Sequence, residues 1–150
     1  MSILNHVRNL RDEEDRLKWE GTFEEYLDIV KERKEVAQTS HSRVYNMIKS
    51  DGFTTENGEK KYHFFGKEIF GLENAIGKLV AEYFHPAAKR LDVRKRILLL
   101  MGPVSGGKST IVTLLKRGIE AYTKTYEGAV YAIKGCSLHE DPLPFITHSL

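Results

Sequence analysis

The sequence predicts an α/β protein in which a helical leader precedes the first half of a three-layer domain built on a parallel sheet. In the leader, apolar side chains recur at helical spacing among many charges. An uninterrupted apolar run at 97–101 is typical of a buried parallel strand. A glycine-rich turn follows this run, and apolar residues return to helical spacing over 111–119. We place the leader at 1–60 and the second domain, which we expect to be incomplete at its C-terminal end, at 61–150.

Three helices are predicted in the leader. An apolar stripe among charges indicates the first, over 3–18. The second spans 23–34, and Thr22 with Glu25 has the pattern of a capping box at its start. The third begins after Ser40 and ends before a polar stretch.

That polar stretch, 51–61, contains the pair Asn57-Gly58, which favours a type I′ turn. It is therefore predicted to be a loop or a hairpin turn, and it is the expected domain boundary. Directly after it, Tyr-His-Phe-Phe predicts a short strand or an aromatic anchor. A helix with one apolar face then opens at Leu72, and we expect Pro86 to stop it.

Two further stretches frame the glycine-rich turn. The basic stretch 87–96 is interpreted as a solvated connector, because no aromatic residue interleaves with its charges as nucleic-acid stacking would require. After the helix that follows the turn, the apolar stretch 129–133 predicts a second strand.

The turn itself fits G-x-x-x-x-G-K-[ST] without departure, between the predicted strand and helix that this pattern requires. Its glycines allow consecutive N–H groups to surround a phosphate at a helix N-terminus, where anions are favoured. Lys108 is expected to reach the β- and γ-phosphates, Ser109 to hold Mg²⁺ and Thr110 to bond an inner phosphate. The alternative is a glycine-rich turn with an exposed lysine. The candidate nucleotide-binding residues are Gly102, Pro103, Val104, Ser105, Gly106, Gly107, Lys108, Ser109 and Thr110.

Charge and cysteine content limit the other classes of partner. A formal net charge of +2 does not favour nucleic acid or an anionic membrane. With Cys136 as the single cysteine and no signal-peptide core, a cytoplasmic location is expected. The longest apolar run is too short for a membrane span. Cys136, His139 and His148 could suggest a metal site, but their spacing matches no standard one.

The motifs together resemble a known family. Phe-Gly-Leu-Glu at 70–73 opens a helix upstream of the P-loop strand, as in the N-terminal linker and core of AAA-type ATPases. Gly-Pro-Val-Ser-Gly-Gly-Lys-Ser is more specific than a general P-loop, and the sequence is similar to the PrkA family of bacterial serine protein kinases. The stretches that carry this resemblance are 16–23, 41–44, 83–97, 101–110 and 132–136.

The resemblance implies an AAA-like fold, ATP with Mg²⁺ as cofactor, and phosphorylation of serine or threonine in a protein substrate. It also implies that Ile69, Phe70 and Gly71 contact the adenine, and it allows a homo-oligomer. No apolar strand ends in Asp-Asp or Asp-Glu here, so the acid that would complete the Mg²⁺ site is expected beyond Leu150. The catalytic residues are thus unassigned, and the chain is expected to bind ATP without turning it over.

Two other functions stay open at this point. One is a small-molecule P-loop kinase or a GTPase, although a compact nucleoside kinase would begin near its P-loop strand and no Asn-Lys-x-Asp stretch reads guanine. The other is a helical protein-interaction module at 1–50 beside a vestigial nucleotide site. Neither accounts for the motifs as fully as an ATP-binding region of a PrkA-type kinase does.

Overall fold

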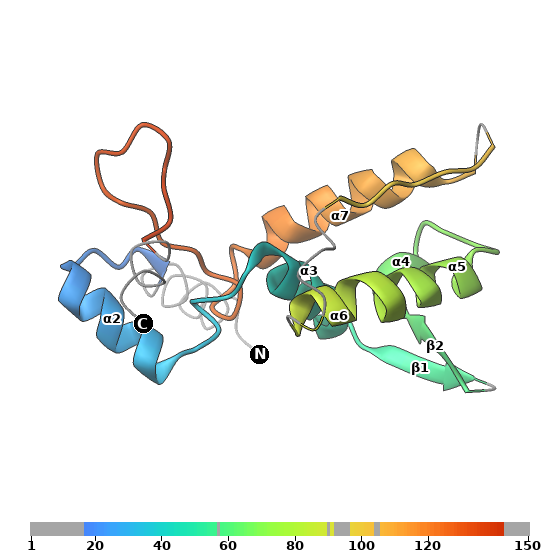
Figure 1. Cartoon of the computed structure of the whole chain (residues 1–150), viewed down its shortest axis with the longest axis horizontal. Coiled ribbons are helices and arrows are strands. Elements are labelled where there is room, and N and C mark those ends of the chain that lie inside the picture. The colour runs from blue at the N-terminus through green and yellow to red at the C-terminus, as the bar shows by residue number, and fades with distance from the viewer. Residues whose placement is uncertain (1–16, 57, 90, 92–96, 104–105, 143–150) are drawn as a thin grey trace, which may run out of the picture. The chain divides into compact units, whose positions relative to one another are not determined.

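The chain forms two compact units in a computed structural model that describes residues 17–56, 58–89, 91, 97–103 and 106–142 (Figure 1). One unit combines Met1–Ala37 with Ala121–Leu150, and the other is Gln38–Glu120. The predicted boundary at residue 60 falls inside the second unit. In the described part of the chain, no helix is long and apolar enough to cross a membrane.

Helix α2 (Phe23–Glu32) is the main element among the described residues of the first unit. The predicted capping box is confirmed: the Thr22 N–H donates to Glu25 Oε2 at 2.6 Å, and the Glu25 N–H donates to Thr22 Oγ1 at 3.3 Å. This reciprocal pair satisfies two N–H groups that have no acceptor inside the helix. The predicted helix at 3–18 lies outside the described residues, apart from its last two positions.

The predicted strand at 129–133 is wrong, because these residues have irregular backbone. Tyr131 instead joins an aromatic cluster in which its ring centroid lies 5.3 Å from Trp19 and 5.9 Å from the buried Tyr26. The Ile133 N–H donates to Glu140 O at 2.9 Å, a bond that closes a loop. Among the described residues no strand lies alongside, so the apolar pattern has no ladder to join.

The second unit begins with two elements that the sequence predicts correctly. Helix α3 (Ser40–Ser50) buries Met47 and Ile48. Strands β1 (Phe53–Glu56) and β2 (Glu59–Tyr62) then pair antiparallel as a hairpin, the outcome that the Asn-Gly pair favours. Gly58 has φ +83°, in the left-handed region that such turns require.

Four helical segments follow the hairpin. They are α4 (His63–Gly66), α5 (Glu73–Lys78), the π-helix η1 (Leu79–Phe84) and α6 (His85–Ala88).

Pro86 does not stop the predicted helix, which continues from η1 into α6. The N–H of His85 bonds to Val80 O, five residues back, so the helix is widened just before the proline. In a regular α-helix the ring of Pro86 would clash with the carbonyl four residues earlier. Proline also has no backbone N–H, so that carbonyl would lose its usual donor. The wider π turn accommodates both effects.

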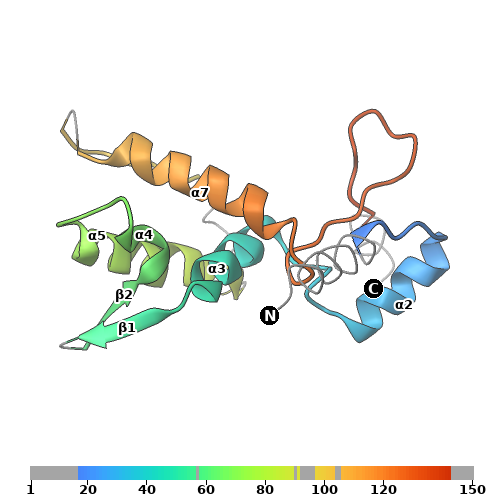
Figure 2. The same ribbon diagram turned by 180° about the vertical axis from the view of Figure 1, so that it is seen from behind.

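Helix α7 (Lys108–Tyr122) follows the glycine-rich turn as predicted, and Ile111 and Leu114 on its apolar face are buried. Its Gly118 lies so close to α3 and α4 that an added Cβ would meet Phe64 Cζ at 2.5 Å and Met47 Sδ at 2.6 Å. The absence of a side chain at this position thus lets α7 pack closely within its unit. Figure 2 shows these elements from the opposite side.

The predicted buried strand at 97–101 is also wrong. Its backbone is irregular, and Ile97, Leu99 and Met101 expose 86%, 74% and 82% of their surface. No strand of the described residues pairs with it, and the only sheet among them is the two-stranded hairpin. The chain therefore has mixed α and β content, but the parallel sheet of the expected three-layer domain stays a prediction.

Candidate functional site

The glycine-rich turn closes on itself just before α7. Gly107 has φ +73°, which strongly favours glycine at this position. The Gly106 N–H donates to Pro103 O at 3.2 Å, and the Ile111 N–H donates to Gly107 O at 2.9 Å to begin the helix. Val104 and Ser105 lie outside the described residues. We call residues 102–110 the phosphate loop from here on.

The ammonium of Lys108 is folded back over the loop. Lys108 Nζ donates to Gly102 O at 2.9 Å and also to Pro103 O. Ser109 is exposed and Thr110 is half-buried in the first turn of α7. A cation and a helix N-terminus, whose first N–H groups have no acceptor within the helix, therefore lie together in one loop. This arrangement can attract an anion.

The other candidate residues, Ile69, Phe70 and Gly71, lie in the turn between α4 and α5. Ile69 is buried, whereas Phe70 exposes 77% of its surface. Gly71 has φ +74°, and its N–H donates to Glu73 Oε1 at 3.2 Å. Hydrogen bonds from the backbone N–H groups of Glu73 itself and of Gly71 lower the pKa of the Glu73 carboxyl. The turn is thus held by its own side chain and presents an aromatic ring to solvent.

Leu72 brings this turn to the phosphate loop. A Cβ added to Gly107 would meet Leu72 Cδ1 at 3.0 Å, so the leucine lies against the loop just before α7. The sequence pattern places Leu72 only on the apolar face of a helix, and no local signal points to this contact. The two predicted groups of site residues are therefore neighbours through a residue that sequence reasoning did not assign to the site.

An ion pair joins the same turn to α7 farther along the helix. Arg117 Nη2 donates to both carboxylate oxygens of Glu68, at 3.0 and 2.8 Å. Both side chains are partly exposed. The sequence gives no indication of this pair, because its members are 49 residues apart.

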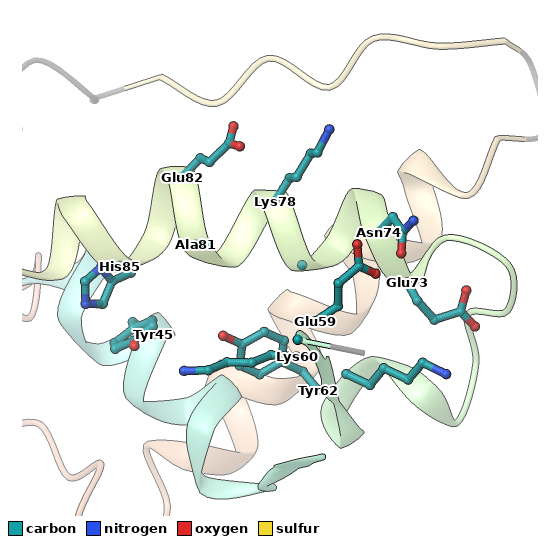
Figure 3. Close-up of a pocket in the computed structure, with 13 residues that line it drawn as sticks. Tyr45, Glu59, Lys60, Tyr62, Glu73, Asn74, Lys78, Ala81, Glu82 and His85 are labelled. Atoms are coloured by element: carbon teal, nitrogen blue, oxygen red, sulfur yellow. The ribbon is translucent and has the colours of Figure 1, made fainter. Parts of the chain in front are cut away.

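Two clefts of the second unit lie near these elements. A groove of about 420 Å³ runs between β2 and the helices α5, η1 and α6 (Figure 3). At one end the rings of Tyr45 and His85 meet edge to face with centroids 5.4 Å apart, and Lys78 and Glu82 point away from β2. None of the described residues of the phosphate loop lines this groove. A smaller cleft of about 210 Å³ is lined partly by Ile69 and Phe70 and faces the hairpin.

Within the described ranges, no three His, Cys, Asp or Glu side chains gather in a group that could hold a metal ion. Cys136 is half-buried and His139 is exposed. His148 lies outside the described residues.

Comparison with known proteins identifies the family of the chain. Residues 21–150 match the family model described as the PrkA AAA domain, and the chain belongs to this family. This confirms the resemblance seen in the motifs. No solved structure matches the chain.

Named relatives differ in the activity that their names state. The chain is 67% identical over its full length to "ATP-dependent protease PrkA" of Bacillus subtilis, and it spans 24% of that protein. It is 63% identical over 97 residues to an uncharacterized protein of Geobacillus stearothermophilus, which the match covers completely. It is 46% identical over 50 residues to "Serine/threonine kinase YeaG" of Escherichia coli, covering 33% of the chain and 8% of that protein.

Proposed function

We propose that this chain binds Mg-ATP through the phosphate loop, as the ATP-binding region of a PrkA-type serine/threonine protein kinase. The position of Lys108 is the observation that supports the proposal most directly. Its ammonium already lies over the loop carbonyls at the N-terminus of α7. A triphosphate is the anion that such a loop binds in other P-loop proteins.

The residues present fit the ligand. In the proposed complex Lys108 exchanges its carbonyl partners for phosphate oxygens, and the N–H groups of the first turn of α7 donate to the same anion. The hydroxyl of Ser109 is exposed and is available to Mg²⁺. Bound Mg-ATP would supply the phosphoryl group of the reaction.

Isothermal titration of the chain with Mg-ATP tests the assignment. Removing one partner of a charge contact that excludes water costs about 2–5 kcal/mol, so Lys108→Ala should weaken binding tens- to thousands-fold. Lys116→Ala is the matched control, because Lys116 is an exposed lysine of the same helix outside the loop. Equal ATP affinity of Lys108→Ala and the parent chain would show that the site is elsewhere.

The reaction class is a separate part of the proposal, because the relatives are named both as a protease and as a kinase. Both names are compatible with use of ATP, and we favour phosphoryl transfer to a protein serine or threonine. In the full-length protein, labelled γ-phosphate should appear on a protein substrate. New peptide N-termini produced with ATP, and no labelled protein, would favour the protease instead.

The chain by itself is expected to bind ATP without hydrolysing it. Phosphoryl transfer needs an acid that holds Mg²⁺, and no apolar strand of this sequence delivers one. Release of phosphate by the pure chain, lost in Lys108→Ala, would contradict this expectation.

A further inference from the structure

The turn between α4 and α5 is attached to α7 at two separated points. At one end, Glu68 accepts two hydrogen bonds from Arg117. At the other end, Leu72 lies against Gly107 at the start of the helix. The two attachment points, Gly107 directly before α7 and Arg117 within it, are ten residues apart, or about 15 Å at the helical rise of 1.5 Å per residue. The turn is therefore held along α7 and not at a single point.

The attached turn carries an exposed aromatic ring two residues before Leu72, the residue that contacts the phosphate loop. Ile69 is buried and fixes the inner side of the turn, whereas Phe70 is exposed. The left-handed backbone of Gly71 reverses the chain directly before Leu72. Because Leu72 contacts Gly107, the turn lies next to the loop that would hold the proposed ligand.

The helix side of the attachment is also fixed. Gly118, next to Arg117, is packed against Phe64 and Met47. Arg117 thus projects from a part of α7 that cannot shift easily within its unit. From this position, its Nη2 donates charge-assisted hydrogen bonds to both carboxylate oxygens of Glu68.

From this arrangement we infer that Glu68, Arg117 and Leu72 are positioning residues that hold residues 69–71 at the nucleoside end of the ligand. Their effect is to favour ATP over inorganic triphosphate. The inference rests on the proposed function, since it concerns the same ligand. It adds a cause of selectivity that the phosphate loop alone does not supply, because the loop contacts only phosphates and Mg²⁺.

The test compares ATP with inorganic triphosphate, each with Mg²⁺, by isothermal titration. Breaking a partly exposed ion pair changes an equilibrium by about two- to five-fold. Arg117→Glu and Glu68→Arg should each weaken ATP binding by at least that factor and leave triphosphate affinity unchanged. The double variant, which restores an opposite pair, should regain the lost ATP affinity. Leu72→Ala should reduce the same ratio of affinities, and its effect should not depend on salt.

Lys116→Glu is the matched control, because it makes the same change of charge at the neighbouring exposed position. Glu68→Gln provides a milder break if a reversed charge lowers the stability of the unit. The inference would be wrong if Arg117→Glu weakened the binding of ATP and triphosphate equally, or if its loss of ATP affinity were no larger than that of Lys116→Glu. Neither result would contradict the proposed phosphate site. A parent chain that binds neither ligand would overturn the proposed function and this inference with it.

Discussion

At the scale of single residues, polar side chains hold the backbone of both candidate segments. The ammonium of Lys108 bonds two carbonyls of the phosphate loop, and the carboxylate of Glu73 bonds the N–H of Gly71. Each bond is local in sequence and satisfies a backbone group at a turn with left-handed glycine geometry. Two predictions can be measured at this scale: the pKa of Glu73 and the effect of removing the exposed ring of Phe70 on ligand binding.

Glu73 should titrate below the ordinary glutamate range in the folded chain. A carboxylate that accepts backbone N–H bonds is stabilised in its charged form, so its folded pKa is depressed. The bond therefore stabilises the fold at all pH values above the pKa of the unfolded chain, and this contribution is lost as the pH falls through the folded pKa. Carboxyl-carbon NMR titration of the native chain measures it, with the same residue in urea as the reference. A native pKa at or above the value in urea would contradict the prediction.

Phe70→Ala should weaken binding of ATP and spare inorganic triphosphate. The ring exposes 77% of its surface, so its removal costs the fold little and leaves a base without a stacking partner. Stacking of a base on an aromatic ring contributes about 1–3 kcal/mol, or about five- to 150-fold in affinity. Titration with both ligands checks this. An equal loss for both would show that Phe70 supports the fold and not the base.

At the scale of elements, one glycine controls how α7 packs. The close contacts of Gly118 with Phe64 and Met47 leave no room for a side chain, whereas Gly77 in α5 would place a Cβ at an ordinary 3.6 Å from Lys60 O. Both glycines lie inside helices, where alanine has the better propensity. Alanine substitutions at these two glycines therefore separate the effect of helix propensity on stability from the effect of packing.

Gly118→Ala should destabilise the chain, and Gly77→Ala should stabilise it. Overpacking costs about 1–3 kcal/mol and exceeds the propensity gain of about 1 kcal/mol at position 118. At position 77 the gain of about 0.5–1 kcal/mol is not opposed. Urea unfolding midpoints at equal m-value measure both changes. A stabilised Gly118→Ala variant would mean that α7 does not pack on α3 and α4 in solution.

At the scale of the whole molecule, the chain holds an apolar segment that is largely exposed in the described part of the structure. Residues 97–101 have the composition of a buried strand but expose three large side chains. In a three-layer domain with a parallel sheet, a segment of this composition would pair with further strands. In the chain studied by itself, its backbone groups and apolar side chains are free to pair with another copy.

The chain should therefore self-associate as its concentration rises, and Leu99→Lys should reduce this association. A charge on such a segment opposes strand pairing between molecules. Val112→Lys is the control, because Val112 is an exposed apolar residue on α7, outside the segment. Light scattering across a dilution series measures the effect. A parent chain that is monomeric throughout, or equal effects of both substitutions, would contradict the prediction.

The sequence by itself determined the elements whose cause is local. The capping box of α2, the limits of α3, the hairpin at Asn57-Gly58 and the helix after the phosphate loop follow from residues a few positions apart, because turns and helix ends are bonded within that distance. The family could also be predicted, since its most specific motif is contiguous in sequence.

Only the tertiary structure decided whether the apolar runs 97–101 and 129–133 form strands. A strand is defined by its bonds to a partner, and the described residues contain none for either run. It also decided that Leu72 contacts Gly107 and that Glu68 pairs with Arg117, because each contact joins residues more than thirty positions apart and leaves no local pattern.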